Sequence, residues 1–142
     1  MTKRIVLQGA GFDKSLRHHC KDKTKDYAKA LKQDLTCLIS LLQNAMPIPD
    51  RYKMHKLESK RDVYDCHLLS RGSDDLVFFR KYKEGGKSYI KLIAVGTHTL
   101  AHRLNASVLE ASVIDDLLGL GLSLDCVLNI DEDDLLIDPD DA

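Results

Sequence analysis

VYDCHLLSRGSDDLVFFRKYKEGGKSYIKLIAV, residues 63–95, is the stretch that decides the fold of this chain. It contains three short apolar segments, at residues 63–69, 76–82 and 89–95, and two connections that contain glycine. Short segments rich in β-branched and aromatic residues, separated by such connections, are typical of antiparallel strands joined by hairpins. We therefore predict a three-stranded meander.

The sequence before this stretch predicts one further strand and two helices. Residues 5–7 are apolar and end at a glycine turn, as a short first strand would. Residues 12–20 are a charged helical candidate, and a longer helix follows in which apolar residues recur at helical spacing. These apolar residues are Tyr27, Leu31, Leu35, Leu38, Ile39, Leu42 and Ala45. The order of elements predicts an α+β fold, with two N-terminal helices packed on one face of a small, mainly antiparallel sheet.

Charge is distributed unevenly along the chain. The net charge of the whole chain is −1, but residues 1–104 contain 21 basic and 11 acidic residues, a net charge of +10. Residues 105–142 contain 11 acidic residues and no Lys or Arg. A basic body is typical of proteins that bind nucleic acid. We predict a basic domain at residues 1–104 and an acidic C-terminal extension at residues 105–142.

The acidic extension has a helix signal of its own. Ser107 and Glu110 have the spacing of a capping box, so we expect a helix over about residues 107–118. Residues 126–130 are a possible strand, and residues 131–142 are expected to form a mobile acidic tail.

Apolar residues in the extension suggest a role for it. Leu117, Leu118 and residues 135–137 interrupt the acidic sequence. We hypothesise that the extension folds back on the basic body, or binds a partner, through charge complementarity and these apolar residues. The alternative is a solubilising appendage with one packed helix.

Several histidines and acids lie at the ends of the predicted elements. Asp65 and His67 are two residues apart on one strand, so their side chains share a face. His98 follows the last strand, a helical turn would bring His102 near it, and His55 lies between the helices and the sheet. A fold that gathers these groups could cleave RNA by general acid–base catalysis. The spacing is equally compatible with an exposed hydrogen-bonded pair and an ordinary turn.

The sequence offers little support for a metal, a disulfide or a membrane segment. The four cysteines are far apart and form no C-x-x-C pair, so we expect reduced thiols. Residues 18–20, His-His-Cys, are adjacent, and adjacent residues rarely bind one ion. The chain has no apolar run of about 18 residues and no signal sequence. We expect a cytoplasmic protein without a cofactor.

Four segments of the basic part carry a resemblance to a known family. They are Ile48-Pro49-Asp50-Arg51-Tyr52-Lys53-Met54-His55-Lys56-Leu57, Val63-Tyr64-Asp65-Cys66-His67, Asp74-Asp75-Leu76-Val77-Phe78-Phe79 and Val95-Gly96-Thr97-His98. In this order and spacing the chain resembles the YafQ branch of the RelE/ParE toxin superfamily, over about residues 1–102. Those proteins are bacterial type II toxin–antitoxin ribonucleases that cut messenger RNA in the ribosomal A site.

The resemblance implies an active site without a metal. His98 would be a candidate general acid, and His55 or His67, with Asp65, would act on the base side. The family also places an aspartate just before the next strand. The predicted catalytic residues are His55, Asp65, His67, Asp74, His98 and His102.

Two positions differ from the family pattern. The family aspartate corresponds to Asp74 or Asp75 of this chain. In the family a bulky apolar residue usually follows the first of these two positions, where this chain has Asp75. The family usually has an aromatic residue four positions beyond the Gly-Thr-His histidine, where this chain has His102. A histidine there could stack on a base or add a group for proton transfer.

The resemblance also implies partners. The expected ones are messenger RNA, the ribosome with its ribosomal RNA, and a cognate antitoxin, and an intramolecular contact of the acidic tail is possible. The predicted RNA-binding residues are Lys25, Lys29, Lys32, Lys53, Lys56 and Arg80. One alternative is a non-catalytic member of the superfamily that binds a protein, as ParE toxins bind gyrase. Another is a degenerate toxin, silenced by its tail, that acts through protein contacts.

Overall fold

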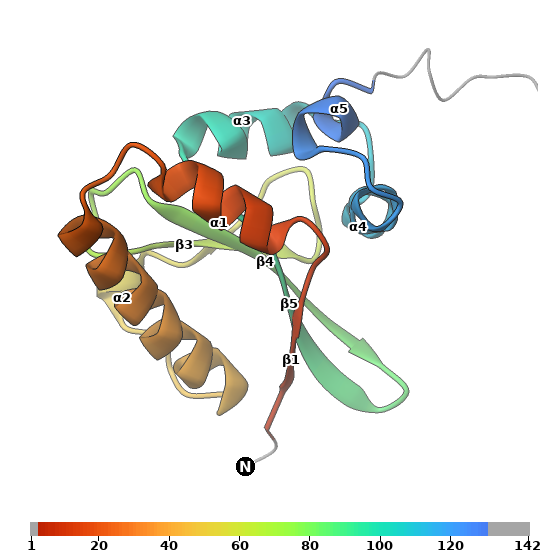
Figure 1. Cartoon of the computed structure of the whole chain (residues 1–142). Helices are drawn as coiled ribbons and strands as arrows, with labels where there is room; N and C mark the ends of the chain where they lie inside the picture. Colours follow the sequence, from red (N-terminus) through yellow and green to blue (C-terminus); the bar gives the residue numbers. More distant parts are fainter. Residues whose placement is uncertain (1–2, 131–142) are drawn as a thin grey trace, which may run out of the picture.

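A computed structural model describes residues 3–130 and has the α+β fold predicted from the sequence. The strands are β1 (Ile5–Gln8), β2 (His55–Lys56), β3 (Val63–His67), β4 (Leu76–Glu84) and β5 (Lys87–Gly96). The helices are α1 (Phe12–Cys20), α2 (Lys25–Gln43), α3 (His98–Ala106), α4 (Ala111–Gly119), α5 (Leu124–Leu128) and a 3₁₀ turn, η1 (Asp50–Tyr52). The strands form one sheet in the order β1-β5-β4-β3-β2, in which only the β1–β5 pair is parallel (Figure 1).

The predicted meander is formed by β3, β4 and β5. Each strand pairs with the next in antiparallel register, and Glu84 pairs with Lys87 across a two-residue turn. Gly85 and Gly86 in that turn have φ values of +57° and +77°. Two successive positive φ angles suit the right-handed twist of the strands and favour glycine at both positions.

Helices α1 and α2 pack on one face of the sheet, which we call the first face (Figure 1). The Thr24 hydroxyl accepts a hydrogen bond from the Tyr27 N–H, 3.1 Å away, and caps the start of α2. The buried stripe of α2 is the one predicted from its spacing, and it packs against β4 residues including Val77 and Phe79. The N-terminal helices therefore bury one apolar cluster on this side.

The opposite, second face carries α3, α4 and α5, and the two N-terminal helices share the first face as predicted (Figure 1). Leu76 and Phe78 of β4 and Val63 of β3 point to this side and form one apolar cluster with the C-terminal helices. The register of β4 and β5 shifts at Phe78/Phe79, where Ile93 is the extra residue of β5. Because of this bulge, Ile93 and its neighbour Ala94 both join the second cluster.

The extension differs from its predicted structure in two places. The expected helix over about residues 107–118 begins instead at Ala111, because the Ser107 N–H still bonds to the Arg103 carbonyl oxygen of α3. The Ser107 hydroxyl accepts from the Leu109 N–H, 3.2 Å away, so the capping box does not form. The possible strand at residues 126–130 is also wrong, since its first three residues belong to α5, whose N-terminus is capped by the Ser123 hydroxyl.

The described part of the extension packs against the basic body. Leu118 is buried and Leu117 is half-buried in the second cluster, which contains residues from both sides of the predicted boundary at residue 104. Buried Asp115 of α4 forms ion pairs with Arg80 and Lys91, at 3.1 and 3.5 Å. The predicted tail, with residues 135–137, lies outside the described residues. No helix within residues 3–130 is long and apolar enough to cross a membrane.

Candidate active site

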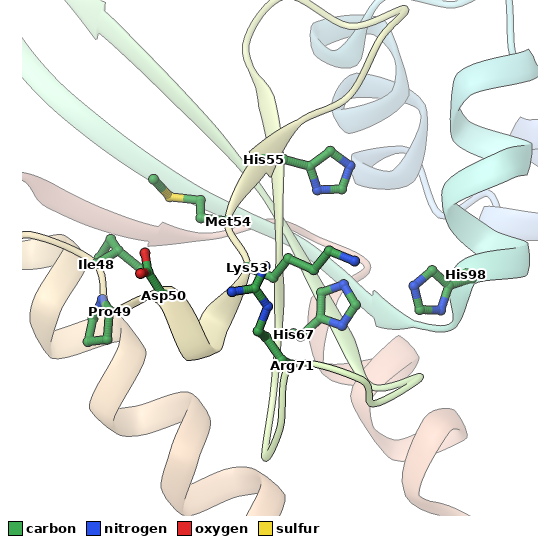
Figure 2. Close-up of a pocket in the computed structure, with 9 residues that line it drawn as sticks. All are labelled: Ile48, Pro49, Asp50, Lys53, Met54, His55, His67, Arg71 and His98. Atoms are coloured by element: carbon green, nitrogen blue, oxygen red, sulfur yellow. The ribbon is translucent and has the colours of Figure 1, made fainter.

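A cavity of about 540 Å³ opens where the C-terminal end of β3 meets the N-terminus of α3. The segment from η1 to β2 and the loop after β3 form its other walls. It is lined by Ile48, Pro49, Asp50, Lys53, Met54, His55, His67, Arg71 and His98. Figure 2 shows these side chains, with the histidines coming from three different elements. The fold therefore brings three of the predicted catalytic residues, His55, His67 and His98, to one cavity.

His98 is held by Asp74. One carboxylate oxygen of Asp74, Oδ1, lies 2.7 Å from the His98 backbone nitrogen and 2.5 Å from its Nδ1. The backbone hydrogen bond, and then the ring contact, lower the pKa of Asp74, which keeps this carboxylate ionised near neutral pH. A carboxylate only accepts, so Nδ1 carries a proton and Nε2 is the nitrogen left to exchange a proton with a substrate.

His67 lies beside His98 in a different environment. Its side chain is 2% exposed, and the two ring centroids are 5.1 Å apart in an edge-to-face arrangement. Burial, followed by the positive charges of His98 and Lys53, lowers the pKa of His67. The Nδ1 atom of His67 is buried without a hydrogen-bond partner among the described residues. At neutral pH, His67 is therefore a neutral imidazole that can accept a proton.

His55 is paired with Asp65 across the β2–β3 ladder. The two residues are opposite one another in the antiparallel register, and His55 Nδ1 lies 2.9 Å from Asp65 Oδ1. The alignment is poor for a hydrogen bond, so neither buried oxygen of Asp65 has a well-aligned donor among residues 3–130. Burial raises the pKa of Asp65, and nearby His55 and His98 oppose this shift. His55 itself is exposed and faces the cavity (Figure 2).

Two further cations line the cavity. Lys53 follows η1 in a left-handed backbone conformation, with φ at 45° and ψ at 46°. Arg71 comes from the exposed loop between β3 and β4. In Figure 2 both side chains lie among the histidines. Such cations can stabilise negative charge that develops on a phosphate during cleavage.

Asp34 of α2 holds the walls that carry these cations. Its carboxylate binds the Arg51 guanidinium through two contacts, of 2.7 and 3.2 Å, and accepts from the Tyr52 hydroxyl at 3.0 Å. It also accepts from the Leu69 N–H, 2.7 Å away. Burial alone would raise the pKa of Asp34, but the hydrogen bonds from Arg51, Leu69 and Tyr52 together lower it. One ionised carboxylate thus fixes η1 and the loop after β3.

Asp75, the other candidate for the family aspartate, points away from the histidines of the cavity. Its buried carboxylate contacts His19 of α1 and Tyr27 of α2. Asp74 is the aspartate that contacts His98. The structure thus distinguishes two adjacent residues that spacing could not.

The other predicted site residues lie outside the cavity. His102 is exposed on α3, one turn beyond His98, and Lys56 is exposed on β2. Arg80 is bound by Asp62 and Asp115, at 2.8 and 3.1 Å, so its charge is already balanced within the chain. Lys25, Lys29 and Lys32 line a separate, open depression on α2, together with Ala28, Gln33 and Thr36.

Sequence reasoning missed Arg71 and Asp34 as parts of the site. Arg71 lies in the connection between two predicted strands, and nothing in a loop sequence reports where its side chain lies. Asp34 had a usable signal. It lies three residues after Leu31 and four before Leu38, so it is a charged residue on the buried stripe of a helix, which needs a partner inside the fold.

One family model and one solved structure match this chain. The family model described as "Bacterial toxin of type II toxin-antitoxin system, YafQ" matches residues 7–102. Among solved structures, a chain of the E. coli DinJ–YafQ complex is similar, with 22% sequence identity and a TM-score of 0.49. That match covers 69% of this chain and 97% of the other. A search of curated proteins found no match.

Proposed function

Because the chain belongs to the YafQ family of toxins from type II toxin–antitoxin systems, we propose that it cleaves messenger RNA on the ribosome. The observation that carries this proposal is the pair of neighbouring rings, His67 and His98, in contrasting environments within one cavity. One ring is buried and neutral, and the other is exposed and held by a carboxylate. Such a difference suits one group to accept a proton and the other to donate one.

In the proposed reaction, the 2′-hydroxyl of the substrate attacks the adjacent phosphorus. Neutral His67 accepts the hydroxyl proton as the O2′–P bond forms. Protonated His98 donates the Nε2 proton to the departing 5′-oxygen as the P–O5′ bond breaks. The products are a 2′,3′-cyclic phosphate, which water can open to a 3′-phosphate, and a 5′-hydroxyl. The side chains and the 2′-hydroxyl supply every proton transferred, so no step requires a metal.

Three cationic groups would stabilise the phosphorane formed during the attack. Lys53 and Arg71 line the cavity beside the histidines, and neither has an ion-pair partner among the described residues. His55, kept in place by Asp65, provides the third when it is protonated. Preorganised cations in a partly enclosed site stabilise developing charge more effectively than water does.

The basic body would bind the ribosome and an antitoxin. We propose that Lys25, Lys29 and Lys32 of α2 contact ribosomal RNA, because they form one unneutralised surface. Arg80 is not proposed as an RNA contact, because two carboxylates already bind its guanidinium group. The E. coli YafQ chain is described in a complex with DinJ, and a comparable antitoxin is the expected protein partner here.

The described part of the extension leaves the cavity open. No residue from 105–130 lines the cavity, and α4 and α5 pack on the apolar part of the second face. We propose that α4 and α5 are part of the folded body rather than a self-inhibiting cover. We also propose that the chain divides functionally near residue 104, with the catalytic groups before it.

Substitution of the two central histidines tests the proposed reaction. For His98→Ala and for His67→Ala we expect the rate of messenger RNA cleavage on purified ribosomes to fall by about 10²–10⁴. His18→Ala, which alters an exposed histidine of α1, is the matched control and should cleave normally. Mapping of 5′ ends would identify the cut sites, and end-group analysis should find 5′-hydroxyls. Full cleavage by His98→Ala would refute the proposed mechanism, whereas a parent chain that cleaves no messenger RNA would favour a toxin that acts by binding a protein.

A further inference from the structure

We propose that Asp75 is a positioning residue for His98, acting through its neighbour Asp74. Asp75 would anchor the loop before β4 to α1 and α2, and the anchored loop would hold the Asp74 carboxylate against the His98 ring. This role rests on the proposed cleavage reaction, in which His98 donates a proton. It assigns a function to a polar cluster outside the cavity.

The cluster is built around one buried carboxylate. The side chain of Asp75 is 2% exposed, and its Oδ1 lies 2.7 Å from His19 Nε2 and 3.7 Å from Lys23 Nζ. Its Oδ2 accepts a short hydrogen bond from the Tyr27 hydroxyl. His19 belongs to the last turn of α1, Lys23 to the linker and Tyr27 to the first turn of α2. Three consecutive parts of the N-terminal layer thus converge on one loop residue.

The protonation of the cluster favours a firm contact. The hydrogen bond to Asp75, then burial, raises the pKa of Tyr27 to about 12, so the phenol keeps its proton and remains a donor at neutral pH. A buried carboxylate is costly unless it is paired and hydrogen-bonded. Moving Asp75 away from His19 and Tyr27 would therefore leave an unsatisfied charge inside the fold, which opposes displacement of the loop.

Asp74 depends on this anchor because it has little else to hold it. Its side chain is 62% exposed, and its hydrogen bonds within residues 3–130 go only to His98. The backbone on either side is fixed by Ser73, whose hydroxyl donates to the Leu68 carbonyl oxygen at 2.6 Å, and by the buried Asp75 side chain. Ser73 and Asp75 thus set the position of Asp74, and Asp74 sets the tautomer and direction of the His98 ring.

The variants Asp75→Asn and Tyr27→Phe test this role. We expect kcat for ribosomal cleavage to fall about tenfold to a hundredfold, with KM for the programmed ribosome changed less than twofold. Tyr27→Phe keeps the carboxylate and His19, so it gives a reading if Asp75→Asn does not fold. Asp115→Asn is the matched control, because it alters another buried carboxylate with cationic partners but lies outside the cavity. An equal loss of kcat in Asp115→Asn would overturn the proposal.

Two measurements separate positioning from a general loss of structure. In a double-mutant cycle, Asp74→Asn/Asp75→Asn should cleave no more slowly than Asp74→Asn alone, because both changes act through one contact. Additive losses would overturn the proposal. The ¹⁵N chemical shifts of the His98 ring should move in Asp75→Asn toward their values in Asp74→Asn, and unchanged shifts would refute the role. This last measurement needs no cleavage, so it remains decisive if the proposed reaction fails.

Discussion

The two faces of the sheet differ in how completely they are covered. On the first face, the apolar cluster beneath α1 and α2 extends to the C-terminal end of β3, where it includes Cys66 and Leu68. On the second face, α3, α4 and α5 cover only the apolar part, and the polar end stays open as the cavity. The change occurs within β3, where Val63 belongs to the apolar cluster and His67 lines the cavity. The candidate site therefore occupies the uncovered part of a face, and the extension determines how large the covered part is.

Removal of residues 105–142 should have the largest effect, because it uncovers the apolar part of the second face. The loss of α4 and α5 would expose Phe78, Ile93 and the other apolar residues of the second cluster to water. Burial of each such side chain contributes roughly 1.5–3 kcal/mol, so the truncated chain should unfold or aggregate. Circular dichroism and thermal unfolding would measure this. A chain that ends at Ile130 keeps both helices and should fold normally, whereas a stable, soluble chain that ends at Leu104 would contradict the prediction.

Asp115→Ala should have a smaller effect on the same face. The substitution removes the carboxylate between Arg80 and Lys91, although Arg80 keeps Asp62 and Lys91 is partly exposed. We expect the free energy of unfolding to decrease by about 2 kcal/mol. Asp116→Ala changes an exposed neighbour on the same helix and should cost less than about 0.5 kcal/mol. Equal denaturation midpoints for the two variants would show that charge contributes little to docking of α4.

Asp34→Asn should disturb the first face and the cavity together. Loss of the ionised acceptor for Arg51, Tyr52 and Leu69 should cost about 1–2 kcal/mol. The pKa of Asp34 is lowered in the folded protein, so its stabilising effect is present above the unfolded value of about 3.9 and is lost as pH falls through the folded pKa. The stability difference between this variant and the parent should thus shrink below about pH 4. A difference that is constant with pH would contradict the assignment.

The smallest expected effect concerns the open end of the second face. It is a shift in the pH dependence of kcat/KM for cleavage. Because burial lowers the pKa of His67, the proposed base, its ring stays unprotonated to a lower pH than an exposed histidine would. The acidic limb of kcat/KM for cleavage should therefore lie below the ordinary histidine value of about 6.5. The rate measured on ribosomes across pH 5–8 would test this. An acidic limb above 6.5 would exclude His67 as the base.

Sequence patterns predicted the elements that depend on local periodicity. The spacing of Leu31, Leu35, Leu38 and Leu42 identified α2, and the Gly-Gly turn identified the β4–β5 hairpin. Alternation along β3 placed Asp65 and His67 on one face, as the structure has them. These features follow from interactions between residues close in sequence, which a pattern can report.

The parts that the sequence did not predict depend on contacts between distant residues. Ser107 fits a capping box by spacing, but its carbonyl accepts from buried Lys60, 2.7 Å away and 47 residues earlier. The apolar residues 126–128 fit a strand by sequence, but in the structure they belong to α5, which packs in the second cluster. The distinction between Asp74 and Asp75 likewise required the positions of α1, α2 and α3.

The extra residue in β5 has a consequence for chemistry as well as for packing. Side chains alternate along a strand, so one inserted residue reverses the phase of all that follow it. Ile93 makes this insertion five residues before His98. Deletion of Ile93 would turn the side chains of residues 94–96 to the opposite face of the sheet. It would also direct the start of α3 toward the first face instead of the second. The position of His98 at the cavity therefore depends on the number of residues in β5 as well as on their identity.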